Sequence, residues 1–133
     1  MLRKGLDAVM NEAFGAYIRN RREALGLSLR SVAMKIGMAP AYLSDVERGN
    51  RYAPPDKFLS ALEQVLEISG DEKDVFYDLA GKCRNDGYPD LREYIDSTDI
   101  ARVALRKARD YKISDRQWQD FIDSMVKNDG STN

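Results

Sequence analysis

The stretch Leu27–Gly49, LSLRSVAMKIGMAPAYLSDVERG, constrains the fold more than any other part of the chain. Ser28 is a favourable N-cap for a helix, and Gly37 stands where a left-handed residue would end that helix. Pro40 suits the first turn of a following helix, where its missing N–H costs nothing. The stretch therefore predicts helix, tight turn, helix.

The second of these helices is expected to have two unlike sides. At about 100° per residue, Leu43, Val46 and Glu47 share one side. The opposite side carries small and polar residues, namely Ala41, Ser44, Asp45 and Arg48. A short helix with a polar outer stripe is typical of a surface that contacts a partner, so we expect this side to face one.

The rest of the chain also shows helical periodicity, without any strand pattern. A first helix is predicted from Phe14 to Leu25, after an ambiguous start that we interpret as frayed. Two more helices are predicted around residues 58–66 and 71–79, and the Gly-, Asn- and Pro-containing segment 81–89 predicts a boundary. We expect an all-α fold with a domain at 1–82, a helical extension at 89–127 and a disordered tail at 128–133.

Composition favours binding over catalysis. Histidine is absent and Cys83 is the only cysteine, which removes the commonest general base and the commonest metal ligand. We therefore expect no enzyme activity, no catalytic residue, no metal and no cofactor. One cysteine suits a reducing compartment, and neither a signal peptide nor an apolar run of about 18 residues is present, so we expect a cytoplasmic protein without a membrane span.

Charge is divided unevenly along the chain, although its net value is −1. Residues 1–60 hold 10 Lys and Arg against 6 Asp and Glu, a net of +4. Residues 61–133 hold 11 against 16, a net of −5. The positive half contains the two-helix stretch, which favours an anionic partner there.

Residues 14–55 resemble the Cro/phage-repressor type of helix-turn-helix, also called the xenobiotic-response-element family. The resemblance is carried by R-E-x-x-G-L-S at 22–28, the small Ala33, Gly37 in the turn, and PAYLSDVERG at 40–49. It implies a five-helix, lambda-repressor-like helix-turn-helix domain, here followed by a small helical C-terminal extension. It also implies double-stranded DNA as the partner, read by the third helix of a homodimer on a palindromic operator.

Residue by residue, the resemblance assigns roles on this surface. The base-facing set would be Ala39, Pro40, Ala41, Tyr42, Ser44, Asp45 and Arg48. Within it, Arg48 could pair with guanine and Asp45 could accept from cytosine N4. Ser28, Arg30, Asn50 and Arg51 are better placed for phosphates.

The family also places an arginine of the first helix against the inward Glu47, and Arg22 matches that position. We expect a structural salt bridge, because an unpaired buried carboxylate is costly. One departure from the family is Ala39, where relatives often carry a Ser or Thr cap.

The C-terminal extension carries apolar residues on two predicted helices. They are Ile100, Val103 and Leu105 on the first, and Trp118, Phe121, Ile122 and Met125 on the second. Core packing and dimerisation both fit them. Our leading hypothesis is a homodimeric transcriptional repressor, with dimerisation through either part of the chain. The alternative is an antitoxin-like module whose C-terminal helices bind a protein partner.

Overall fold

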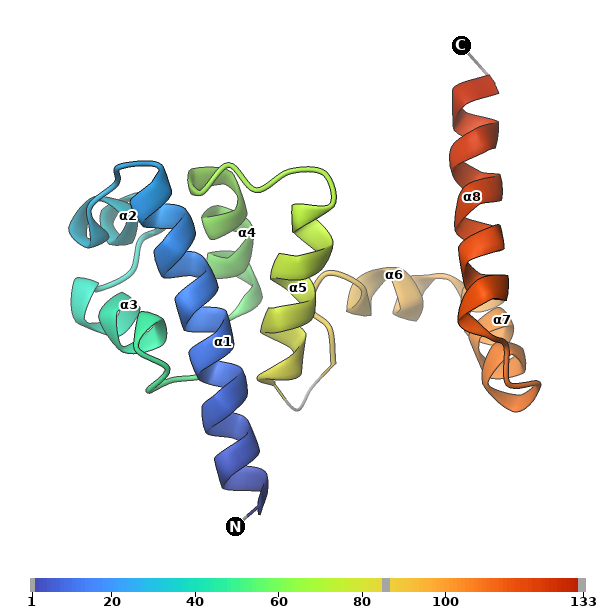
Figure 1. Cartoon of the computed structure of the whole chain (residues 1–133), viewed down its shortest axis with the longest axis horizontal. Coiled ribbons are helices and arrows are strands. Elements are labelled where there is room, and N and C mark those ends of the chain that lie inside the picture. Colours follow the sequence, from blue (N-terminus) through green and yellow to red (C-terminus); the bar gives the residue numbers. More distant parts are fainter. Residues whose placement is uncertain (1, 85–86, 132–133) are drawn as a thin grey trace. The chain divides into compact units, whose positions relative to one another are not determined.

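A computed structural model describes residues 2–84 and 87–131, with side chains described at position 5 and over 8–84 and 87–128. Within these ranges the chain is helical and contains no strand (Figure 1), which confirms the predicted all-α class. In chain order the helices are α1 (Leu2–Ala24), α2 (Leu29–Ile36), α3 (Pro40–Glu47), α4 (Asp56–Val65), α5 (Glu72–Lys82), α6 (Arg92–Ser97), α7 (Asp99–Asp110) and α8 (Asp115–Ser131).

The chain divides into two compact units, Met1–Glu93 and Tyr94–Asn133. The division lies later than the predicted segment 81–89, because side chains beyond α5 contact the first unit. Arg84 donates from Nη1 to Asp56 at 2.9 Å, and Arg92 lies 3.6 Å from the same carboxylate. A Cβ built on Gly81 would lie 2.1 Å from the ring of Tyr88. Such contacts cannot be read from the local composition that marks a boundary.

The first unit packs α1 to α5 around one apolar core. Its fully buried large side chains come from all five helices and from the residues that flank α4 and α5: Phe14, Ile18, Val32, Leu43, Val46, Pro54, Leu59, Leu62, Leu66, Phe76 and Cys83. The rings of Phe14 and Phe76 lie with centroids 5.7 Å apart, joining α1 to α5. Helix α1 begins at Leu2 and not near Phe14, so the expectation of a frayed start is not met. Gly5 costs only about 1 kcal/mol within a helix, a penalty that neighbouring helical residues can offset.

The close approach of α1 to α3 depends on a glycine to which the sequence analysis gave no role. A Cβ on Gly15 would lie 2.4 Å from the carbonyl oxygen of Val46 and 2.5 Å from that of Glu47. At the end of α3, Gly49 has φ +78°, and a Cβ there would meet the backbone and side chain of Glu12. These two glycines let the backbone of α1 lie directly against the C-terminal end of α3.

The second unit has little packing of its own. None of its described side chains, from 94 to 128, is buried. Its last helix starts with the predicted capping box, since Ser114 Oγ accepts from the Gln117 amide and Gln117 Oε1 accepts from the Ser114 amide. Helix α8 then continues to Ser131, where the sequence predicted a disordered tail from 128, because each further residue of a started helix gains a local hydrogen bond. Residues 132–133 of that tail lie outside the described residues.

Candidate nucleic-acid interface

The α2–turn–α3 stretch follows the local signals in its sequence. Ser28 adopts an extended conformation, and its hydroxyl accepts from the amide of Ser31 at 3.1 Å. Gly37 has φ +77°, and its N–H reaches the last carbonyls of α2. Pro40 opens α3, preceded by Ala39, which caps the helix without any side-chain hydrogen bond. Both helices therefore start where the sequence predicted, and α2 also ends where it predicted.

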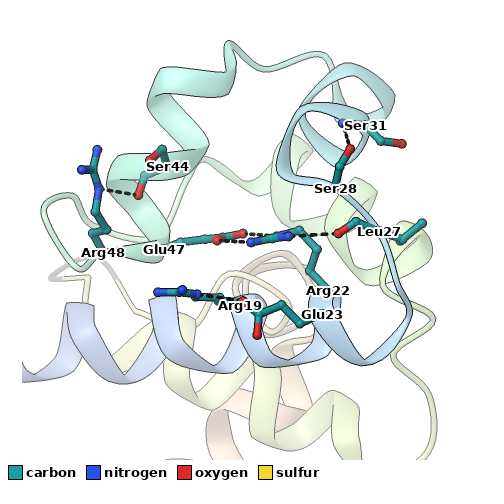
Figure 2. Close-up of polar contacts among 9 residues, drawn as sticks. All are labelled: Arg19, Arg22, Glu23, Leu27, Ser28, Ser31, Ser44, Glu47 and Arg48. Carbon is teal, nitrogen blue, oxygen red and sulfur yellow. Dashed lines mark hydrogen bonds and ion pairs between the residues drawn. The ribbon is translucent and has the colours of Figure 1, made fainter.

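The orientation of α3 is held by a buried ion pair (Figure 2). Arg22 Nε lies 2.8 Å from Glu47 Oε2, and Arg22 Nη2 lies 2.9 Å from Oε1, so the contact is bidentate. The two side chains are only 13% and 5% exposed. The hydrogen bond to Glu47 raises the pKa of the Arg22 guanidinium above its ordinary value. Nη1 also donates to the carbonyl of Leu27 at 2.9 Å, so one arginine joins α1, α3 and the loop before α2.

The residues assigned to DNA lie on the outside of this stretch. Three of them, Tyr42, Ser44 and Asp45, are half-buried. The exposed ones are Ser28, Arg30, Ala39, Pro40, Ala41, Arg48, Asn50 and Arg51. The buried side of α3 consists of Leu43, Val46 and Glu47, as the helical periodicity predicted.

Four of these residues contact one another in an arrangement that sequence reasoning missed. Asp45 Oδ1 lies 3.2 Å from Arg48 Nη2, and Asp45 Oδ2 lies 3.5 Å from Arg51 Nε. The Arg51 guanidinium stacks over the ring of Tyr42 at 4.5 Å from its centroid. We call Tyr42, Asp45, Arg48 and Arg51 the Asp45 cluster. The i,i+3 spacing of Asp45 and Arg48 was the available signal. Arg51 lies beyond the helix, so its place in the cluster required the loop conformation.

The described residues offer little support for a metal site, a reactive cysteine or a membrane span. No three His, Cys, Asp or Glu side chains within the described ranges gather closely enough to hold a metal ion. The buried Cys83 has a structural place, since its Sγ accepts from the amide of Ala53 and donates to the carbonyl of Ala80, both at 3.3 Å. No helix in the described part of the chain is long and apolar enough to cross a membrane.

Comparisons with known proteins place the chain in a family. Residues 18–73 match the helix-turn-helix family. An uncharacterised HTH-type transcriptional regulator of Mycobacterium tuberculosis (strain H37Rv) is 30% identical over 109 residues, covering 82% of this chain and 66% of that protein. SinR of Bacillus subtilis, an HTH-type transcriptional regulator, is 29% identical over 109 residues, which are 82% of this chain and 88% of SinR.

Among solved structures, the chain is similar to the clp gene regulator ClgR of Corynebacterium glutamicum. The identity is 31% and the TM-score 0.46, over 71% of this chain and 88% of that one. The chain thus spans only about two thirds of the mycobacterial relative, 66%, but most of SinR and ClgR. Its sequence motif, the match of residues 18–73 and the two relatives found by sequence show that the chain belongs to the helix-turn-helix family of DNA-binding transcriptional regulators, of the Cro/phage-repressor or xenobiotic-response-element type.

Proposed function

We propose that the protein is a repressor that binds a specific double-stranded operator as a homodimer, with α3 of each copy in the major groove. The observation that carries the proposal is the fixed orientation of α3. The buried Arg22–Glu47 pair and the buried Leu43 and Val46 hold one side of the helix against the core. The opposite side is thereby kept outward, rigid and available to a groove about 12 Å wide.

The roles of the outward residues follow from their chemistry and exposure. Five residues would face base edges largely through shape and apolar contact: Ala39, Pro40, Ala41, Tyr42 and Ser44. Arg48 would donate to a base edge, and Asp45 lies beside it. Ser28, Arg30, Asn50 and Arg51 flank α3 in sequence and would contact phosphates through hydroxyl, amide and guanidinium groups. The net charge of +4 over residues 1–60 supports attraction to DNA.

The homodimer is supported by the second unit. Its large apolar side chains remain exposed: Ile100, Val103, Leu105, Trp118, Phe121, Ile122 and Met125. Trp118 and Phe121 already stack edge-to-face at 6.2 Å on one side of α8. None of the described side chains of the second unit is buried, so its apolar side chains would gain free energy by burial against another chain. A palindromic operator has two-fold symmetry, and a homodimer matches that symmetry. Two recognition helices would then lie about 34–36 Å apart, and a dimer spanning successive grooves would obstruct a promoter.

The first experiment is selection of bound fragments from a random duplex library, followed by titration of the selected DNA at several salt concentrations. We expect a palindromic site and an affinity that falls steeply as salt rises. Arg48→Gln should weaken binding to the selected site about 5-fold or more, whereas Lys82→Gln, at the end of α5, serves as the charge-matched control. Absence of any preferred sequence, or an affinity indifferent to salt, would contradict the proposal.

The second experiment tests the homodimer by light scattering. Ile122→Glu places a charge within the exposed apolar side of α8, and Ser124→Glu adds the same charge away from it. We expect the first variant to dissociate into monomers and to lose operator affinity, and the second to behave as wild type. The same apolar side chains also favour the alternative, an antitoxin-like module. A monomeric wild-type chain that acquires its operator affinity only with a protein partner would support that alternative and overturn the homodimer.

A further inference from the structure

On the proposed DNA-facing side of α3, one carboxylate lies between two arginines. Asp45 uses one oxygen for Arg48, at 3.2 Å, and the other for Arg51, at 3.5 Å. Its side chain is 35% exposed, whereas those of Arg48 and Arg51 are 60% and 51% exposed. The two cations are therefore open to a ligand, and each has an intramolecular anion beside it.

Both arginines also have neutral partners that keep them at the protein surface. Arg48 Nε donates to the carbonyl oxygen of Ser44, 3.4 Å away. This contact is one of the dashed lines in Figure 2. The Arg51 guanidinium stacks on Tyr42, at 4.5 Å from the ring centroid. These contacts hold the guanidinium groups near Asp45, so in the free protein their charges are partly neutralised before any phosphate arrives.

This arrangement affects arbitrary DNA and the operator differently. Any duplex offers phosphates to Arg48 and Arg51, but it must compete with Asp45 and bring its own negative charge near that carboxylate. An operator adds base-edge contacts that an arbitrary duplex lacks, and these offset the competition. Discrimination is the difference between the affinities for the operator and for an arbitrary duplex. A group that weakens binding to the arbitrary duplex more than binding to the operator therefore increases discrimination.

We propose that Asp45 is a specificity-determining residue that acts by restraining Arg48 and Arg51, and not by reading a base. The proposal rests on the proposed function, since it assumes that α3 faces DNA. It differs from the reading of Asp45 as an acceptor for cytosine N4, under which loss of the carboxylate would harm the operator complex alone.

The test compares Asp45→Asn with wild type on the selected operator and on a duplex of scrambled sequence and equal composition. Asparagine keeps the size of the side chain and removes its charge. We expect the scrambled duplex to bind about 3- to 10-fold tighter, and the operator to gain less, so that the ratio of the two affinities falls at least about 3-fold. Because one or both arginines become free for phosphates, log K should depend more steeply on log salt, by about 1 to 2.

Three further proteins separate the restraint from a general charge effect. Asp71→Asn, at the start of α5, removes the same charge away from α3 and should change either affinity less than about 2-fold. Asp45→Glu keeps the charge and should keep most of the discrimination. In an Arg48→Gln/Arg51→Gln background, Asp45→Asn should lose most of its effect on the scrambled duplex, because the restrained groups are gone.

A measurement without DNA distinguishes the failure of this proposal from the failure of the proposed function. The Nε–H of Arg51 should exchange with solvent several-fold faster in Asp45→Asn than in wild type. Unchanged exchange, together with an unchanged affinity for scrambled DNA, would overturn the restraint. A loss of operator affinity alone would overturn it in favour of cytosine reading. If wild type shows no preferred DNA, it is the proposed function, on which the restraint depends, that fails.

Discussion

The stability of the first unit should depend strongly on the Arg22–Glu47 pair. In Arg22→Met the carboxylate of Glu47, 5% exposed, loses hydrogen bonds of 2.8 and 2.9 Å. Removing one partner of a buried pair costs about 3–5 kcal/mol, and we take the lower end because Arg22 is 13% exposed. The carbonyl of Leu27 also loses its donor, which adds about 1 kcal/mol. The expected loss is about 4 kcal/mol, a large part of the roughly 5–15 kcal/mol of a typical domain.

The assay is urea unfolding followed by two probes. Circular dichroism at 222 nm follows the helices of both units. Trp118 is the only tryptophan and lies in α8, so its fluorescence follows the second unit. We expect the substitution to shift the transition of the first unit to lower urea and to leave a Trp118 transition in place. Glu47→Gln, whose amide oxygen can still accept from Arg22, should cost less, about 1–2 kcal/mol.

A double variant tests whether the loss of stability comes from the unpaired buried charge. In Arg22→Met/Glu47→Leu both charges are replaced by apolar groups, so most of the lost stability should return. A cost below about 1 kcal/mol for Arg22→Met would show that the pair does not hold α3. A double variant as unstable as the sum of its single changes would show that the cost does not come from an unpaired buried charge.

Three further changes test other parts of the first unit. Gly15→Ala places a methyl group 2.4 Å from a carbonyl oxygen of α3 and should lower stability by about 1–3 kcal/mol in thermal unfolding; a stabilised variant would contradict the close approach. Ala39→Ser supplies the missing cap of α3 and should raise stability by about 0.5–2 kcal/mol, a gain that Ala39→Val should not reproduce. Partial desolvation, together with nearby carboxylates such as Asp78 and Asp74, raises the pKa of Asp90, although this residue remains exposed. Its protonated form is thus favoured by folding, and stability is lost as pH rises through that raised pKa. Asp90→Asn should therefore raise the Tm at pH 7 but not near pH 3, and an equal shift at both would exclude ionisation as the cause.

Much of the helix-turn-helix stretch could be predicted from the sequence, because its signals act over three or four residues. Ser28 caps α2 and Gly37 ends it, and Pro40 starts α3; each depends on backbone groups next to it in the chain. The buried side of α3 follows from helical periodicity alone. The partnership of Arg22 with Glu47 is different, since 25 residues separate them and only the family resemblance pointed to it.

Only the tertiary structure shows which groups come together from distant positions in the chain or through irregular backbone. Gly15 is needed because the carbonyls of α3 lie against α1, and no local pattern marks that approach. Arg84 and Arg92 extend the first unit beyond its apparent boundary because both reach Asp56, across the fold. The sequence by itself determined which helices form and which side of α3 is buried. The neighbours of each charge were decided by the fold, since Coulomb and contact energies depend on distances in space. Asp45 thus lies within 3.5 Å of both Arg48 and Arg51, and the contact with Arg51 depends on the loop after α3.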